Sequence, residues 1–549
     1  MDTTNRELLF SPQMGPVLLK SHIMGYSEIY CHICGVSFNI NRGRTDEEPR
    51  SAAWGDRCDF VSGFARGNCP DKGGCFFVQR DLNGDQSTLA SSELNKKCIP
   101  LIESDDSSDD SQGNISDVSS ANSDFDWDYI PEDWEHIASP ECGQSSAYNG
   151  HHISVEAMRG CTTLQCLVRK SENWKPAPDD EQFEIQGHFF LSGLSDHMPS
   201  RDICEPVVFP ERHSEKYPRA ENCLWGPEGA ETYAMPFHPT CLEVFKRASL
   251  YRYGVVDLEC LTQWWVLELT YDDFHAFPRY EGVSNAQEQY WQHNLGDEFL
   301  AANPCFVPGL EPLLSSTQQH EHIHSEFIPT GVVSGTVPAD LFSLLPGEIR
   351  LMILTQLSFK DIAKLRLASR TFMQLPTSLF YQLTMRDTPW LYEAWSSLPL
   401  SFWATTTQSE EERKQELVDI RVKELRQAIQ SPEMVNAQGT IDSLKKDIDE
   451  LLERNRTPRP TTSVTLLSRT DTDWYALQTL ITRNWKTLPG LKNRRRIWDD
   501  CQEILNRVDA YRKEGKICPG EAVDLAEVGR QYDQRKRRSR AGGQVLNAY

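Results

Sequence analysis

A short stretch near the middle of the chain constrains the fold most, because it contains start signals and apolar repeats for three consecutive helices. The pair Leu345-Pro346 suits the beginning of the first helix, since proline pre-sets the first helical turn, and an acidic residue follows near the positive helix N-terminus. An apolar residue then recurs at every fourth position, which lays one stripe along a helix: Ile349, Ile353 and Leu357. We expect an amphipathic helix here.

The next residues continue this pattern. Ser358 and Asp361 have the form of a capping box that starts a second helix. Ile362 and Leu365 lie on one face of that helix, and a third short helix is expected around residues 379–383. The sequence therefore predicts a small three-helix unit.

The ordered positions of this unit resemble the F-box, a helical module that docks proteins into SCF-type ubiquitin ligases. The resemblance implies that residues 338–392 bind the SCF adaptor subunit and, through it, a cullin. The residues that match the F-box pattern, and that the resemblance therefore places at the adaptor interface, are Leu345, Pro346, Glu348, Ile349, Ile353, Leu357, Asp361, Leu365, Arg366, Ser369 and Arg370. The alternative is that the three helices only fill the interior of this protein.

A second pattern lies near the start of the chain, where Cys31 and Cys34 are followed by Gly35. Two cysteines separated by two residues can place both sulfurs on one ion, and the glycine lets the backbone turn. His238 and Cys241 are the favoured second half, because residues three apart share a helix face. Together they predict one structural zinc ion with four protein ligands.

Two alternatives to this zinc site remain open. Cys69 and Cys75 are a rival second half, closer in sequence to the first pair. Without a metal, all of these cysteines would be small buried hydrophobic residues.

The stretch from Tyr30 to about Tyr271 resembles a domain found upstream of the F-box in filamentous-fungal F-box proteins. The motifs that carry the resemblance are Cys31-x-x-Cys34-Gly35, Arg201-Asp202 and Phe237-His238-Pro239-x-Cys241. We expect strands at 183–185, 188–191 and 207–209, and helices after residue 238. The resemblance brings no activity with it.

Charge is distributed unevenly along this acidic chain, whose net charge is −24. No Lys or Arg occurs between Lys97 and Arg159, and residues 103–110 begin an acidic, Ser-rich tract. Such a stretch buries too little apolar surface to offset its ordering entropy, so we interpret it as a disordered insertion, either a spacer or a phosphorylatable switch. The acidic balance also argues against broad binding of nucleic acid or anionic membranes.

At 549 residues the chain is too long for one ordinary domain. We predict an α+β multi-domain protein with a three-helix F-box and an all-α C-terminal region that includes charged helices at 410–430 and 440–453. The predicted parts are a mixed α/β N-terminal domain at 1–100 and 150–300, an acidic insertion at 101–149, a linker at 301–337, the F-box at 338–392, the helical region at 393–525 and a basic disordered tail at 526–549. The basic cluster at 492–496 is interpreted as an exposed helix face or a contact for the acidic tract, and the one at 535–540 as a nuclear-import signal or a solvated tail.

Three further observations bear on the class of protein. The common phosphate-loop, zinc-protease and nucleophile-elbow motifs are absent from the sequence, so we expect no catalysis. No secretory signal or membrane-spanning apolar run is evident, so we expect an intracellular protein, cytoplasmic and/or nuclear, whose 16 cysteines are thiols or metal ligands rather than disulfides. The predicted function is a non-catalytic adaptor that presents an unknown protein target. The alternative is a zinc-stabilised nuclear protein that binds nucleic acid or acts as a scaffold.

Overall fold

The computed structural model describes residues 30–54, 75–79, 134–143, 147–170, 174–196, 212, 234–269, 277–286, 293–318, 340–431, 438–454 and 459–518. Most of the predicted acidic insertion, the Arg201-Asp202 motif, the strand expected at 207–209 and the predicted basic tail lie outside these residues.

A three-stranded antiparallel sheet forms the β part of the main body. β5 (Gln165–Arg169) lies in the middle, between β6 (Phe189–Leu191) and β7 (Ala234–Phe237). The strand expected at 188–191 is thus confirmed as β6. The one expected at 183–185 is wrong, because this segment forms the short helix α3 (Gln182–Gln186), whose start is fixed by a capping box between Glu181 and Glu184.

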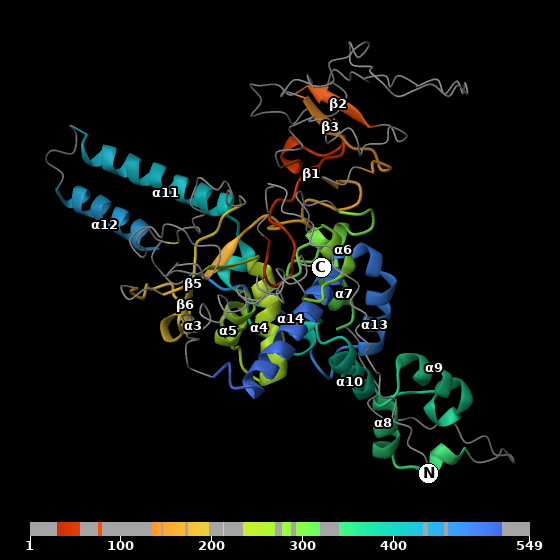
Figure 1. Cartoon of the computed structure of the whole chain (residues 1–549). Coiled ribbons are helices and arrows are strands. Elements are labelled where there is room, and N and C mark those ends of the chain that lie inside the picture. Colours follow the sequence, from red (N-terminus) through yellow and green to blue (C-terminus); the bar gives the residue numbers. More distant parts are fainter. Residues whose placement is uncertain are drawn as a thin grey trace, which may run out of the picture.

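The core of the body is built from helices that are distant in sequence. α4 (Pro239–Tyr253), α5 (Leu258–Leu269) and the long α14 (Pro489–Lys513) pack together (Figure 1). One continuous apolar cluster runs from Cys31 to Ile517 and includes the fully buried Trp264, Trp265 and Trp474. The segments that we assigned to an N-terminal domain and to a C-terminal helical region therefore share one core.

Part of the predicted linker belongs to this core as well. α6 (Glu281–Ala286) is followed by α7 (Leu310–Ser316), and α7 buries Leu310 and Leu314. The backbone amide of Asp473, which precedes α13 (Trp474–Arg483), donates to the carbonyl of Thr317 at 3.0 Å. The boundary at residue 301 is therefore a correction: the ordered body continues to at least residue 318, because apolar residues of α7 find partners on the C-terminal helices.

Residues 340–387 form a separate small helical unit that extends from the body (Figure 1). It consists of the 3₁₀ helix η4 (Leu341–Leu344), α8 (Gly347–Thr355), α9 (Phe359–Ala368) and α10 (Thr377–Asp387). The unit has its own apolar core, formed by Leu354, Ile362, Phe372, Leu379 and Leu383. The predicted three-helix module is present.

α11 (Gln408–Ile429) and α12 (Gln438–Arg454) lie side by side and extend from the body in another direction (Figure 1). They correspond to the two charged helices expected from the sequence. Val422, Leu425 and Ile448 form the contact between them. Within the described ranges, no helix combines the length and the apolarity that crossing a bilayer requires.

Two small strand pairs lie near the start of the chain. β1 (Arg42–Gly43) pairs in parallel with β4 (Tyr148–Asn149), and β2 (Phe76–Gln79) pairs antiparallel with β3 (Trp134–Ile137). Residues 134–143 and 147–149, which lie in the segment that we interpreted as a disordered insertion, are thus structured.

The basic cluster at 492–496 is not the exposed face that we expected. Arg494 is fully buried; its guanidinium donates to both carboxylate oxygens of Glu393 at 2.9 Å and to the carbonyl of Pro304 at 2.6 Å. Arg496 is buried too, against Asp500. Arginine can be buried when its planar group finds carboxylate and carbonyl acceptors, and a sequence does not show whether such acceptors come near. Arg495, between them, is exposed.

Replacing Arg494 with alanine is expected to destabilise the body by about 3–5 kcal/mol, because Glu393 would be left as a buried, uncompensated charge. Urea unfolding of the full chain measures the loss. The exposed neighbour gives a matched control, since Arg495→Ala should change the unfolding free energy by less than about 0.5 kcal/mol. Equal effects of the two substitutions would contradict the buried ion pair.

Candidate metal centre and docking module

The Cys31–Gly35 segment folds as a tight turn. The amide of Gly35 donates to the carbonyl of Cys31 at 2.7 Å, and the amide of Cys31 donates to the carbonyl of Val36 at 2.9 Å. Gly35 has a φ of 76°, in the left-handed region, and a Cβ at this position would lie 2.6 Å from Cδ of Arg279. Both the backbone conformation and the lack of space therefore require glycine here.

The junction of β7 and α4 supplies the other two side chains. His238 is the N-cap residue of α4, Pro239 occupies the first turn, and Cys241 follows in the same turn. The Nε2 atom of His238 lies 2.9 Å from the carbonyl oxygen of Cys161. A proton on Nε2 donates to this carbonyl, which leaves Nδ1 as the atom that faces the sulfurs.

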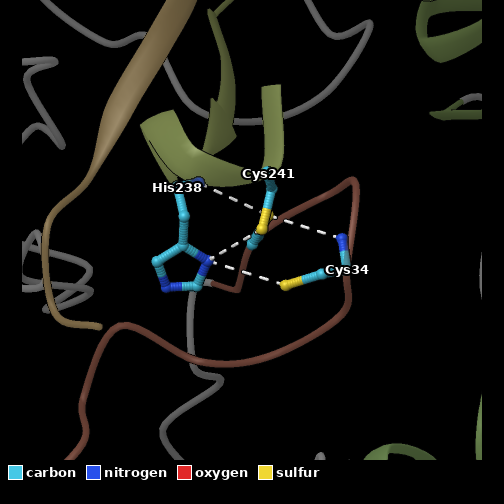
Figure 2. Close-up of side chains that lie close together, drawn as sticks. Cys34, His238 and Cys241 are labelled. Carbon is cyan, nitrogen blue, oxygen red and sulfur yellow. Dashed lines mark hydrogen bonds between the residues drawn. The ribbon is translucent and has the colours of Figure 1, made fainter. Parts of the chain in front are cut away.

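The four side chains predicted from the sequence come together in one buried cluster. Figure 2 shows Cys34, His238 and Cys241 of this cluster. Their ligand atoms all lie within 4.8 Å of one another, and Nδ1 of His238 is 3.6 Å from Sγ of Cys34 and 3.9 Å from Sγ of Cys241. A tetrahedral zinc ion with ordinary Zn–S and Zn–N bonds holds such atoms about 3.5 Å apart. Cys31, Cys34, His238 and Cys241 could therefore hold a metal ion.

The surroundings favour a thiolate at Cys34, whereas burial and the neighbouring sulfurs raise the pKa of the Cys241 thiol well above its usual value. The amides of Cys34 and His238 donate to Sγ of Cys31 at 3.4 Å, and the amide of Val36 donates to Sγ of Cys34 at 3.5 Å. Burial works to raise the pKa of the Cys34 thiol, but hydrogen bonds from Cys241, Cys31 and His238 hold it well below its usual value. Burial likewise works to lower the pKa of the His238 imidazole, yet the charges of the Cys31 and Cys34 sulfurs raise it to about 10. A cation in the cluster would take the place of these shared protons.

Two arginines, the partly buried Arg279 and the buried Arg496, hold the turn from outside. Arg279 donates to the carbonyls of His32 and Ile33 at 3.0 and 2.8 Å, and Arg496 of α14 donates to the carbonyl of Cys34 at 2.8 Å. Three thiolates and one zinc ion would carry a net charge of −1, which a nearby guanidinium would balance. Sequence reasoning missed both arginines, because their partners are backbone carbonyls.

The rival ligand pair is not supported. Cys75 lies beside His136 and Cys142, in a different cluster, and Cys69 lies outside the described residues. With four protein ligands, the cluster at Cys31 leaves no open coordination position, which is typical of a structural ion.

The predicted docking residues of the three-helix unit fall into three groups. Pro346, Glu348, Ile349, Asp361 and Arg370 are exposed. Leu345, Ile353, Leu357, Leu365 and Arg366 are half-buried. Of these, Leu357 and Leu365 pack against the core of the unit itself. Ser369 is buried.

Several of the polar residues predicted to dock stabilise the unit itself. Oγ of Ser369 donates to the carboxylate of Asp340 at 2.5 Å, and this bond, with others from Thr371 and from the backbone, lowers the pKa of Asp340 to about 2. Asp361 and Ser358 cap α9, as expected, with the Asp361 amide 3.2 Å from the Ser358 hydroxyl. Arg366 donates to the carbonyl of Met373 at 3.0 Å.

Sequence reasoning missed several exposed apolar side chains of this unit. They are Leu341, Leu344, Met352, Leu367 and Met373. Together with Ile349 they make up six of the large apolar side chains that are exposed in the described part of the chain, within only 33 residues. The sequence of α8 did contain a signal for such exposure. Its apolar residues surround most of the helix, whereas packing against a single core requires apolar residues on one face alone.

Comparison with known proteins gives a match to a relative and a more informative match to a family model. A segment of 54 residues is 44% identical to the ATP-dependent RNA helicase mss116, mitochondrial, of Aspergillus oryzae, and this segment is 10% of the present chain and 8% of the helicase. The chain thus spans a small fraction of that relative. No solved structure matches.

The informative match is to a family model, the F-box domain, at residues 342–380. These residues contain α8, α9 and the beginning of α10, together with the small core that they enclose. F-box domains bind the adaptor subunit of SCF-type ubiquitin ligases and, through it, cullins. The chain carries an F-box domain at residues 342–380, folded as a helical unit with its own core.

Proposed function

We propose that the chain is a non-catalytic substrate-adaptor subunit of an SCF-type ubiquitin ligase, acting in the cytoplasm or the nucleus. Its F-box would dock on the SCF adaptor and its body would present a protein target. The observation that carries the proposal is the F-box match at 342–380 on a unit whose apolar side chains are exposed.

The exposed apolar residues suit a docking surface. Leu341 and Leu344 are three apart in a 3₁₀ helix, so they lie on one side of it. Ile349 and Met352 are neighbours on one face of α8. Exposed apolar clusters of this kind mark interaction sites, and burying such anchors supplies most of the binding energy at an interface.

The attachment of the F-box to the body suits the task of presenting a target. α10 contributes Leu379 and Leu383 to the F-box core, while its Phe380 and Tyr381 pack against the core of the body. Nε2 of Gln478 on α13 donates to the hydroxyls of Thr384 on α10 and of its C-cap residue Thr388, at 3.0 and 3.1 Å. One helix thus belongs to both cores, so a target bound on the body would be held at a defined position relative to the adaptor.

The Cys/His cluster would serve this body as a structural zinc site. It joins the beginning of the described chain to α4 and, through Arg496, to α14. The alternative of nucleic-acid binding rests on the basic cluster at 535–540, which lies outside the described residues.

The proposed role is tested by reconstitution. The full chain should co-elute with the SCF adaptor and a cullin, and proteins captured from cell extract by this assembly should gain ubiquitin when the remaining ligase components are added. Assembly without any ubiquitinated protein would indicate a scaffold, and failure to assemble would reject the ligase role.

A further inference from the structure

A second group of metal-ligand side chains lies away from the first cluster, at the β2–β3 pair. Cys75 immediately precedes β2, His136 lies on β3, and Cys142 follows in the turn after β3. Their ligand atoms all lie within 4.8 Å of one another. We propose that Cys75, His136 and Cys142 bind a second zinc ion, in a site independent of the one at Cys31.

The local backbone positions the three side chains. Antiparallel pairing places Phe76 opposite Ile137 and Phe77 opposite His136, so Cys75 is held next to the end of β3. After β3 the chain turns back, with the amide of Cys142 donating to the carbonyl of Ser139 at 3.1 Å. Cys142 and His136 are buried and Cys75 is partly exposed, which leaves a route by which an ion can enter.

The contacts of the sulfur in this cluster resemble those in the first one. The amide of Ser139 donates to Sγ of Cys75 at 3.4 Å, the same kind of amide-to-sulfur bond that surrounds Cys31. The side-chain amide of Asn149 donates to the carbonyl of Ser139 at 2.7 Å and fixes the turn. A turn held in this way keeps the ligands in place before the ion arrives.

The chemistry of the donor set selects the ion. Two thiolates and a neutral imidazole are poor ligands for the hard cations Mg²⁺ and Ca²⁺ and good ligands for zinc. When both thiols lose their protons, the two thiolates balance the +2 charge of the zinc ion. Three ligands from the described residues leave the fourth tetrahedral position for water or another donor.

The location gives the site a role. β2 ends at Gln79 and β3 begins at Trp134, so one ion would join the two ends of the stretch 80–133, which contains the acidic, Ser-rich tract. An isolated pair of short strands is marginally stable in water. The ion would fix the base of this stretch to the turn at Ser139.

Metal analysis of the purified full chain under reducing conditions tests the proposal. We expect about two zinc equivalents for the unmodified chain, and a loss of one equivalent in Cys142→Ser and in Cys75→Ser. Cys518→Ser, which removes a partly exposed cysteine outside both clusters, should keep both equivalents. Hydrogen exchange should then rise at 75–79 and 134–142 in the two site variants, while 239–253 stays protected, which shows that the body remains folded.

Three outcomes would overturn the second site. The first is an unchanged zinc content in both Cys142→Ser and Cys75→Ser. The second is an unmodified chain that holds one zinc, lost on Cys34→Ser and not on Cys142→Ser. The third is a disulfide between Cys75 and Cys142 in the reduced preparation, seen as a loss of two hydrogen masses. None of these outcomes concerns the F-box, so the proposed docking function is tested independently of the second zinc site.

Discussion

Introducing glutamate at Leu344 and Met352 together is expected to lower the affinity of the full chain for the SCF adaptor by about 1,000-fold, or ~4 kcal/mol, because two apolar anchors are each worth ~2 kcal/mol at the centre of an interface. The two side chains are 74% and 64% exposed, and neither belongs to the core of the F-box. The double variant should therefore fold normally, and isothermal titration against the purified adaptor measures the loss.

A matched control comes from the α11–α12 pair. Leu417 on α11 is 63% exposed, and Leu417→Glu should leave adaptor binding within twofold of the unmodified chain. If Leu344→Glu/Met352→Glu and Leu417→Glu bind the adaptor equally well, the exposed face of the F-box does not dock. Thermal unfolding of each variant confirms that a loss of binding is not a loss of fold.

Loss of the proposed zinc ion from the Cys31 cluster should have the largest effect on stability. Cys34→Ser is expected to cost about 5 kcal/mol or more, since structural zinc binding is coupled to folding and the turn at Cys31–Gly35 connects α4 with α14. A strong chelator added to the unmodified chain should lower the unfolding temperature in the same way, and added zinc should restore it. Circular dichroism and metal analysis of the same samples follow both changes.

Cys260 provides the control for removing a buried sulfur alone. It lies in α5, is as buried as Cys34 and belongs to neither cluster. Cys260→Ser should keep the zinc content and cost less than about 2 kcal/mol. A chain that contains no zinc, and whose unfolding a chelator leaves unchanged, would rule out the structural ion.

Local signals in the sequence were sufficient to predict the F-box and to name the four side chains that meet in the first cluster. The order of Leu345-Pro346, Asp361 and Ser369 is specific for the F-box because each position has its own local role. The Leu-Pro pair is a candidate for the interface, Asp361 is a partner in the cap of α9, and Ser369 is a buried hydrogen-bond donor. His238 and Cys241 could be matched to Cys31 and Cys34 because a metal demands few residue types at fixed spacings.

Structural features that depend on contacts between segments distant in the sequence could not be predicted. Periodicity identified α4 and α14 as amphipathic but not that they pack together, so one core was divided into two domains. The burial of Arg494 depends on Glu393, about a hundred residues away. The cluster at His136 was missed for the same reason, since Cys75 and Cys142 approach only through the pairing of β2 and β3.

Hydrogen exchange of the full chain with and without the SCF adaptor tests the central claim most directly. If the apolar face of the F-box receives another subunit, the adaptor should slow amide exchange across residues 341–373, with little change in α11, α12 and α14. Unchanged exchange at 341–373 in the presence of saturating adaptor would contradict the account.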